Sequence, residues 1–235
     1  LLSVSLGAAE TTLLNLTSAY ASFVNGGKKI EPNLISRIQN RRGKTIFKLE
    51  NKKCIGCDKF LNDSEVYPFI EYENERVFSE ETAYQITSIL EGAVKRGTAK
   101  KLKDLKVPLA GKTGTTNKNY DAWFIGFSSN LVVGVYVGFD NPKTLGRYET
   151  GSKAALPIFK DFIKNVLFKE DFKEFRIPEG IYLTSLNYNT GLRSPLGDKN
   201  TIIEALKAKD INNIDNNKLI SIHSYDKLIK YRQFY

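Results

Sequence analysis

The sequence predicts an α+β fold in which helices flank an antiparallel sheet. Three segments rich in apolar residues, 109–116, 120–127 and 131–139, follow one another with short breaks, and segments with apolar residues at helical spacing lie before and after them. Only Ser128-Ser129-Asn130 separates the last two strands, so we expect them to pair antiparallel through a tight turn. Because their apolar content scarcely alternates, we expect a sheet that is covered on both faces.

The composition is that of an ordinary globular protein. Of the 235 residues, 41% are hydrophobic and 26% are charged, which argues against intrinsic disorder. A chain of this length can bury about 70% of the surface that its unfolded form would expose, so it needs no disulfide scaffold. Because residue 1 is Leu and the chain contains no Met, we expect a C-terminal piece of a longer protein, with any targeting segment or anchor upstream.

The formal net charge of +9 would attract polyanions such as nucleic acid, anionic lipid or acidic wall polymers. The basic residues are spread out, as in Lys28-Lys29, Arg41-Arg42, Lys52-Lys53 and 95–106, and there is no single basic helix and no aromatic-basic RNA signature. We therefore interpret them as solvated surface charges and predict no nucleic-acid partner, with nucleic-acid binding as the alternative.

The first part of the chain predicts a helix and a hairpin. The helix spans 11–25, with Thr11 or Thr12 as its cap and Asn25-Gly26-Gly27 at its end. Its apolar stripe is Leu13, Leu16, Tyr20, Phe23 and Val24. A polar turn at 40–43 lies between two apolar runs, which predicts the hairpin. The polar stretch 51–75 is interpreted as an insertion or a surface loop.

Two further helices are predicted, over 79–95 and 154–168. Ser79 caps the first, and Gly97-Thr98 either merely ends it or borders a cleft. Pro157 is acceptable only in the first turn of the second helix. The residues expected to face the core are Ile86, Ile89, Leu90 and Val94 in the first helix, and Ile158, Phe159, Phe162, Ile163 and Val166 in the second. We thus divide the chain into a body, 1–168, an extension with short strands, 169–206, and a polar peripheral tail, 207–235.

The sharpest chemical signal is Lys112-Thr113-Gly114, which lies in the first predicted strand. Lys-Thr-Gly is the third motif of penicillin-binding proteins and class A β-lactamases. The small Gly114 would let a substrate approach an edge strand closely, as one more strand. An ammonium and hydroxyl groups can hold a carboxylate, and a strand N–H can stabilise an oxyanion. The alternative is a surface lysine beside a threonine-rich strand end.

The longer context resembles class A penicillin-binding proteins, the bifunctional cell-wall synthases. The matching residues around and after the motif are 111–117, 121–127, 132–140, 149–151 and 154–159. Matches before it are 5–7 and 16–27, and a later match runs from 177–180 through 190–192. The resemblance covers about residues 1–206, whereas 51–75 and the tail after Lys207 match poorly. It implies that 1–168 is the C-terminal portion of a transpeptidase domain, with part of the fold of serine transpeptidases and β-lactamases.

The resemblance also assigns the site residues. It implies catalytic roles for Lys112 and Thr115, and substrate binding by Thr113, Gly114 and Thr116. The Thr115 hydroxyl would bind the terminal carboxylate of the stem peptide with help from Thr113, and the Thr115 N–H would form half of the oxyanion hole. No metal and no organic cofactor is implied.

The nucleophile of this family is not found in its expected place. Ser-x-x-Lys and Ser-x-Asn precede Lys-Thr-Gly in these proteins, and both would lie upstream of residue 1. Three stretches fit these motifs in letters, namely 224–227, 128–130 and 185–187, but all follow Lys112 and we assign them no role. We therefore expect the isolated chain to be inactive, because acyl transfer through a covalent intermediate needs that serine.

For the parent protein the resemblance implies penicillin-sensitive cross-linking of peptidoglycan by a D,D-transpeptidase. The partners would be stem peptides ending in D-Ala-D-Ala and β-lactams, at the periplasmic face of the inner membrane, with membrane contact only through an N-terminal anchor. The alternatives are a β-lactamase or D,D-carboxypeptidase of the same superfamily, and a non-catalytic remnant or wall-binding module.

Four other residues are candidates for a structural or chemical role. Cys54 and Cys57 are spaced for a loop disulfide, a redox pair or half of a zinc site, but His223 is the only other soft ligand and lies far along the chain. In an oxidising compartment they would form the disulfide, and in a reducing one two free thiols. We interpret His223 as an incidental surface residue of the tail, and Trp123 as a core residue between sheet and helix.

Overall fold

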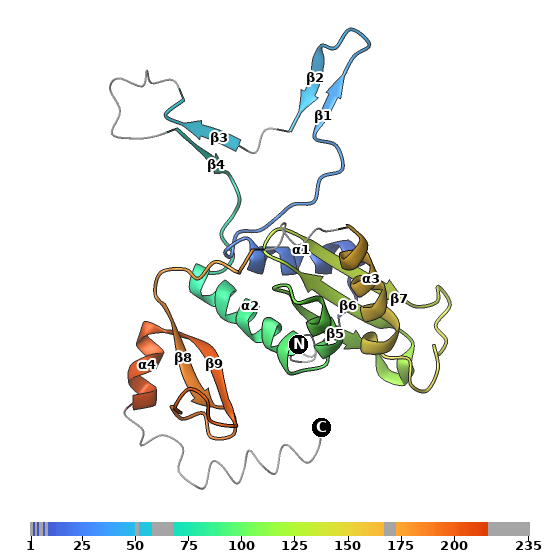
Figure 1. Ribbon diagram of the computed structural model, residues 1–235. Coiled ribbons are helices and arrows are strands. Elements are labelled where there is room, and N and C mark those ends of the chain that lie inside the picture. Colours follow the sequence, from blue (N-terminus) through green and yellow to red (C-terminus); the bar gives the residue numbers. More distant parts are fainter. Residues whose placement is uncertain are drawn as a thin grey trace.

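The computed structural model describes residues 2, 4, 7, 9–49, 52–57, 68–166 and 173–215, without the side chains of 212–215. Its body is a three-stranded antiparallel sheet in the order β5-β6-β7, formed by Ala110–Thr115, Ala122–Phe127 and Val132–Val137 (Figure 1). In the register Lys112 lies opposite Ile125, which lies opposite Gly134. The predicted strands, their antiparallel pairing and the turn after Phe127 are confirmed.

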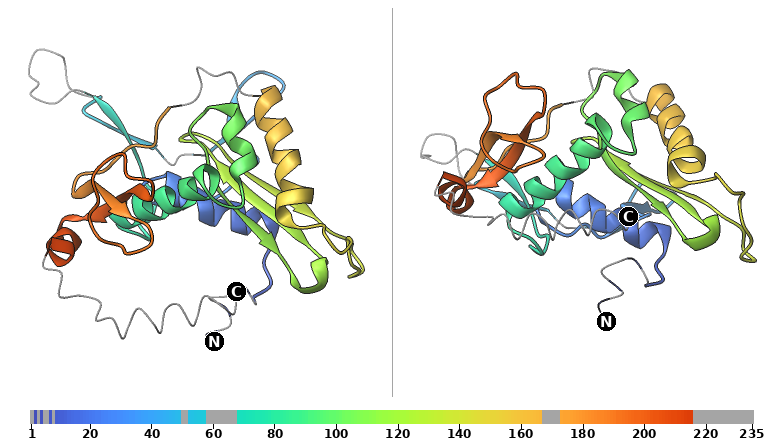
Figure 2. Two further views of the ribbon diagram at one scale, coloured as in Figure 1. Left: turned by 60° about the horizontal axis from the view of Figure 1, so that its bottom comes forward. Right: turned by 90° about the horizontal axis from the view of Figure 1, so that it is seen from below.

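Helices cover both faces of this sheet, as its apolar sequence predicts (Figure 2). Helix α1, Leu13–Val24, packs on one face, where the absence of a side chain at Gly134 makes room for Thr17 and Leu13. Helix α3, Leu156–Val166, packs on the other, where a Cβ at Gly126 would lie 2.6 Å from the ring of Phe159. Phe159 also makes an edge contact with Phe124 at 4.9 Å between ring centroids.

The core lies between the sheet and these helices. Helix α2, Glu80–Lys95, runs against β5 and contributes Leu90 and Val94 to it. The 3₁₀ turn η3, Lys100–Leu105, follows shortly after Gly97-Thr98, and it buries Leu102 completely. Full burial of the large side chains supplies most of the hydrophobic stabilisation of such a body. These fully buried side chains are Phe124, Phe127, Phe159, Leu102, Leu109 and Leu156.

The helix starts follow the predicted caps. The Thr12 hydroxyl accepts a hydrogen bond from the Asn15 N–H at 3.1 Å, and the Ser79 hydroxyl accepts one from the Thr82 N–H at 3.3 Å. Gly26 and Gly27 follow α1 with positive φ, a conformation that glycine adopts without strain.

The predicted core faces of α2 and α3 are partly wrong. Ile89 is 58% exposed in α2, while Ile158, Phe162 and Val166 are 51%, 41% and 52% exposed in α3. Only Phe159 and Ile163 of the predicted set in α3 are buried, because a helix on a three-stranded sheet touches it along a narrow stripe at i, i+4 spacing. Pro157 lies in the first turn as expected, after the π-helical turn η5, Gly151–Ala155, and the predicted end at residue 168 lies outside the described residues.

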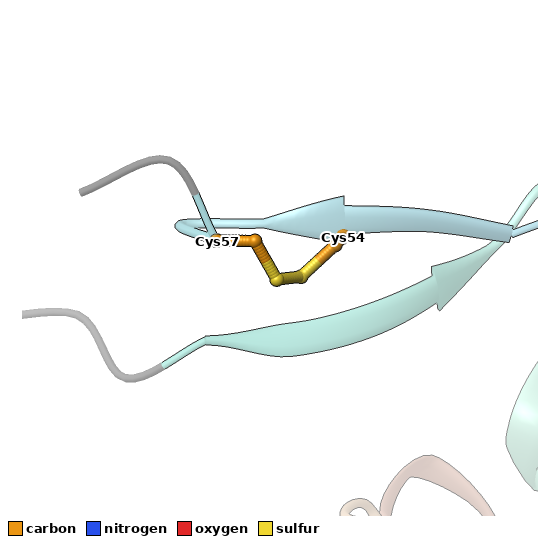
Figure 3. Close-up of a disulfide and its surroundings, with 2 residues drawn as sticks. All are labelled: Cys54 and Cys57. Carbon is orange, nitrogen blue, oxygen red and sulfur yellow. A yellow bond between two sulfur atoms is a disulfide. The ribbon is translucent and has the colours of Figure 1, made fainter.

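Two hairpins project from the body between α1 and α2 (Figure 1). The first pairs β1, Arg37–Gln39, with β2, Thr45–Lys48, around the predicted turn. The second pairs β3, Lys52–Ile55, with β4, Phe69–Tyr72, so the described parts of the predicted insertion or surface loop 51–75 form an exposed hairpin. A disulfide joins Cys54 to Cys57 at the end of β3 (Figure 3).

A further antiparallel pair follows the body. Strands β8, Ile181–Asn187, and β9, Thr201–Lys207, precede helix α4, Ala208–Asp215. The pair lies along α2, where the Gln85 side chain donates to the Ala205 carbonyl at 3.1 Å and the Lys207 ammonium donates to the Thr82 hydroxyl at 2.7 Å. His223 and the 224–227 stretch lie outside the described residues.

Candidate active site

The Lys-Thr-Gly motif lies on β5, an edge strand of the central sheet. Side chains alternate between the faces of a strand, so Thr113 and Thr115 share the face of Phe124 and α3, whereas Lys112 and Gly114 share the opposite face with α1. From the sequence, the ammonium and the hydroxyls were expected to hold one carboxylate together. In the structure the ammonium and the two hydroxyls lie on opposite faces of β5.

The Lys112 side chain is exposed but remains beside the strand. Its ammonium donates a hydrogen bond to the backbone carbonyl of Thr113 at 2.7 Å. An ammonium carries three N–H donors, so two remain for an anion that approaches the edge of β5.

The Thr115 hydroxyl has its orientation set by another segment. The Gly151 N–H donates to Thr115 Oγ1 at 3.0 Å. Because this bond occupies an acceptor site of the hydroxyl, the single hydroxyl proton remains available to a ligand. Thr115 itself is exposed.

Gly151 is the first residue of η5 and rests directly on the strand that carries the motif. A Cβ at this position would lie 2.5 Å from the Gly114 carbonyl oxygen and still closer to that of Trp123. In the sequence, Glu149-Thr150-Gly151 contributes to the resemblance but gives no sign of a contact with the motif. The structure shows that its glycine permits η5 to approach β5, so the motif and this turn form one unit.

Thr98 also reaches the motif. It follows the C-terminal end of α2, and its hydroxyl lies 3.0 Å from that of Thr113. Sequence reasoning left open whether Gly97-Thr98 borders the site or merely ends the helix. This contact brings Thr98 to the motif.

The remaining predicted residues have largely structural contacts. The Thr116 hydroxyl accepts from the Asp121 N–H at 2.8 Å and thereby holds the connection between β5 and β6. Trp123 is half-buried and packs against Tyr136 with tilted rings, 4.7 Å between centroids, on the Lys112 face. Tyr136 donates to Asp121 at 2.8 Å, which raises the pKa of this tyrosine.

The serines that fit the missing motifs in letters hold the chain's own turns. Ser128 is fully buried and its hydroxyl donates to the Asn130 side chain at 2.8 Å. Ser185 lies in β8 and its hydroxyl donates to the Ser194 carbonyl at 2.7 Å. Neither hydroxyl contacts Lys112 or Thr115.

The motif lies on an open edge rather than inside a cavity. Three cavities of about 500, 530 and 590 Å³ lie around α1, α2 and the projecting hairpins, and Lys112 and Thr115 line none of the three. Within the described ranges, no cluster of three His, Cys, Asp or Glu residues could hold a metal ion. The site thus consists of hydrogen-bond donors along a strand.

A family model matches the part of the chain that contains the motif strand β5, the strands β6 and β7, and most of helix α3. The model for the penicillin binding protein transpeptidase domain matches residues 1–164. The chain belongs to this family. The match includes both α1 and the Lys-Thr-Gly strand, and it confirms the resemblance drawn from the motifs.

Relatives in this family come from several bacteria. The chain is 41% identical to penicillin-binding protein 1A of Rickettsia felis over 97% of its own length, and 32% identical to that of Pseudomonas aeruginosa over 88%. In each case it spans 29% of the relative. The chain is thus a portion of a transpeptidase domain of the class A, penicillin-binding protein 1A type.

Solved structures give the same result for the fold. The crystal structure of penicillin-binding protein 1A from Haemophilus influenzae aligns with 86% of this chain and 32% of its own, at a TM-score of 0.70 and 36% identity. The protein PonA1 from Mycobacterium tuberculosis, at 23% identity, aligns with a TM-score of 0.55 and supports the fold alone. The predicted α+β class with an antiparallel sheet is confirmed. No described helix has the length and apolarity needed to span a membrane.

Proposed function

We propose that this chain supplies the substrate-binding strand of a serine D,D-transpeptidase that cross-links peptidoglycan stem peptides. The observation that carries the proposal is the edge strand β5, which places two hydroxyl groups and an ammonium within four residues. An edge strand can bind an extended peptide through its backbone, and hydroxyl and ammonium donors suit the terminal carboxylate of a D-Ala-D-Ala end.

Each residue of the motif then has a role. Thr115 donates its free hydroxyl proton to the substrate carboxylate, Thr113 assists, and the Thr115 N–H forms part of the oxyanion hole. Lys112 supplies positive charge beside the carboxylate and the reacting groups. Gly114, which has no side chain, leaves room for the substrate backbone, and Thr116 holds the end of the strand in place.

The nucleophile would come from a Ser-x-x-Lys motif upstream in a longer protein. Its hydroxyl attacks the D-Ala-D-Ala amide carbon, the amide C–N bond breaks, and D-Ala leaves with the proton. An amine of a second stem peptide then attacks the acyl-serine ester and returns the proton to the serine. β-Lactams would acylate the same serine. The site would face the periplasm from a protein anchored in the inner membrane through an upstream segment.

Labelling with a fluorescent penicillin tests this proposal. We expect the longer protein to form a stable covalent adduct, and we expect the 235-residue chain to form none, because we place the nucleophilic serine upstream of residue 1. An adduct on the isolated chain would show that the chain itself contains a nucleophile and that our placement of the serine upstream is wrong. Rapid release of hydrolysed penicillin would support the β-lactamase or carboxypeptidase alternative, and a longer protein that is never labelled would support the non-catalytic remnant.

A further inference from the structure

The hydroxyl groups of Thr98 and Thr113 form a pair at the edge of the candidate active site. Their oxygen atoms are 3.0 Å apart, and either can be the donor. Thr98 is exposed and Thr113 is half-buried, so the pair lies where solvent and substrate can reach it.

The backbone around Thr98 is held in place from both sides. The N–H groups of its neighbours, Gly97 and Ala99, both donate to the Ala93 carbonyl, each at 3.1 Å. Ala99 is fully buried, and a Cβ at Gly97 would lie 2.9 Å from the Cα of Ala93. The end of α2 thus fixes the position from which the Thr98 hydroxyl reaches Thr113.

The proton count of the pair explains what this contact does. Two hydroxyl groups carry two protons, and the bond between them uses one. If Thr98 donates, the proton of Thr113 is left pointing away from Thr98. If Thr113 donates, the proton of Thr98 is left at the same edge. Only the first arrangement leaves the Thr113 proton for an anion beside β5, and a bound carboxylate favours that arrangement because it accepts this proton.

We propose that Thr98 is a positioning residue for recognition of the substrate carboxylate, acting through the hydroxyl of Thr113. The inference rests on the proposed transpeptidase function, in which Thr113 assists Thr115 at that carboxylate. A hydroxyl held in advance avoids the loss of rotational freedom that a free rotor would suffer on binding. Through this pair, recognition of the carboxylate at β5 also depends on the position of the C-terminal end of α2.

The test compares Thr98→Val, which keeps the shape without the hydroxyl, with Thr98→Ser, which keeps the hydroxyl. The matched control is Thr82→Val, at the other end of α2, where the hydroxyl accepts from Lys207. In the longer protein, acylation rate constants are measured with benzylpenicillin and with its methyl ester, which lacks the negative charge. Thermal midpoints are recorded for every variant.

We expect Thr98→Val to slow acylation by benzylpenicillin about tenfold, since hydrogen bonds to charged groups are among the strong ones. The rate with the ester and the thermal midpoint should stay unchanged, and Thr98→Ser should retain the wild-type preference for the carboxylate. Equal rates for Thr98→Val and wild type, or an equal fall with both probes, would overturn the inference. Failure of the wild-type protein to react at all would instead refute the proposed function.

Discussion

Substitution of Gly151 by alanine tests the unit formed by η5 and the motif strand. The added methyl group would lie 2.5 Å from the Gly114 carbonyl oxygen and 3.1 Å from the Gly114 nitrogen. Non-bonded contacts are comfortable at about 3.5–4.0 Å, so η5 and β5 must separate by about 1 Å. Both neighbours in this contact are backbone atoms and cannot rotate away as a side chain could. The hydrogen bond from the Gly151 N–H to Thr115 Oγ1 would lengthen at the same time.

Two effects of different size follow from this shift. Overpacking of this kind destabilises a protein by about 1–3 kcal/mol. A misplacement of about 1 Å at a site can cost about a hundredfold in rate. We therefore expect Gly151→Ala to fold with a modest loss of stability while its acylation by a fluorescent penicillin falls by about 10–100-fold. Chemical denaturation measures the first effect, and acylation kinetics of the longer protein measure the second.

Gly134→Ala is the matched control for this experiment. Its methyl group would meet the Thr17 hydroxyl most closely, then Leu13 at 2.9 Å and Ile125 at 3.1 Å, beneath α1 on the opposite face of the sheet from Thr115. It should lose comparable stability and keep most of its acylation rate. If Gly151→Ala acylated at the wild-type rate, the proposed dependence of Thr115 on η5 would be wrong. If both variants lost the same rate, the effect would be one of general stability.

Three further predictions concern the rest of the molecule. Phe159→Ala should cost about 3–5 kcal/mol in urea unfolding, because its fully buried ring fills the space between α3 and the sheet. Replacement of both Cys54 and Cys57 by serine should leave the urea midpoint of unfolding of the body unchanged, because their hairpin is exposed and projects from the body (Figure 1). The hydrogen bond that Tyr136 donates to Asp121 raises the pKa of Tyr136 above the usual 10.0. The bond should therefore hold at neutral pH and be lost as the pH rises through this raised pKa. In an alkaline absorbance titration, Tyr136→Phe should remove one late-titrating phenol.

The central sheet was predictable because its signals are local. Two strands joined by the short turn Ser128-Ser129-Asn130 can pair with each other only in the antiparallel sense, and their unbroken apolar runs require cover on both faces. The caps at Thr12 and Ser79 are equally local, since each side chain bonds to an N–H three residues along the chain.

The buried faces of the helices were less predictable, because burial depends on the width of the partner surface. In α3 the sequence offers five large apolar residues on neighbouring positions, and only Phe159 and Ile163 reach the sheet. The hairpin within 51–75 was missed for a related reason, since its strands are exposed at every position and show no alternation of burial.

The candidate site shows the same division between local and distant information. The letters Lys-Thr-Gly indicated which strand to examine, but the groups that orient its hydroxyls lie 15 and 36 residues away, at Thr98 and Gly151. Both partners engage the hydroxyls from within the chain, because the Gly151 N–H donates to Thr115 and the hydroxyls of Thr98 and Thr113 share a hydrogen bond. A strand with the same letters but without these two partners would carry freely rotating hydroxyls, and binding an anion would then require ordering them. The recognition chemistry that we propose therefore belongs to the junction of β5, the end of α2 and η5, and not to the three-residue motif alone.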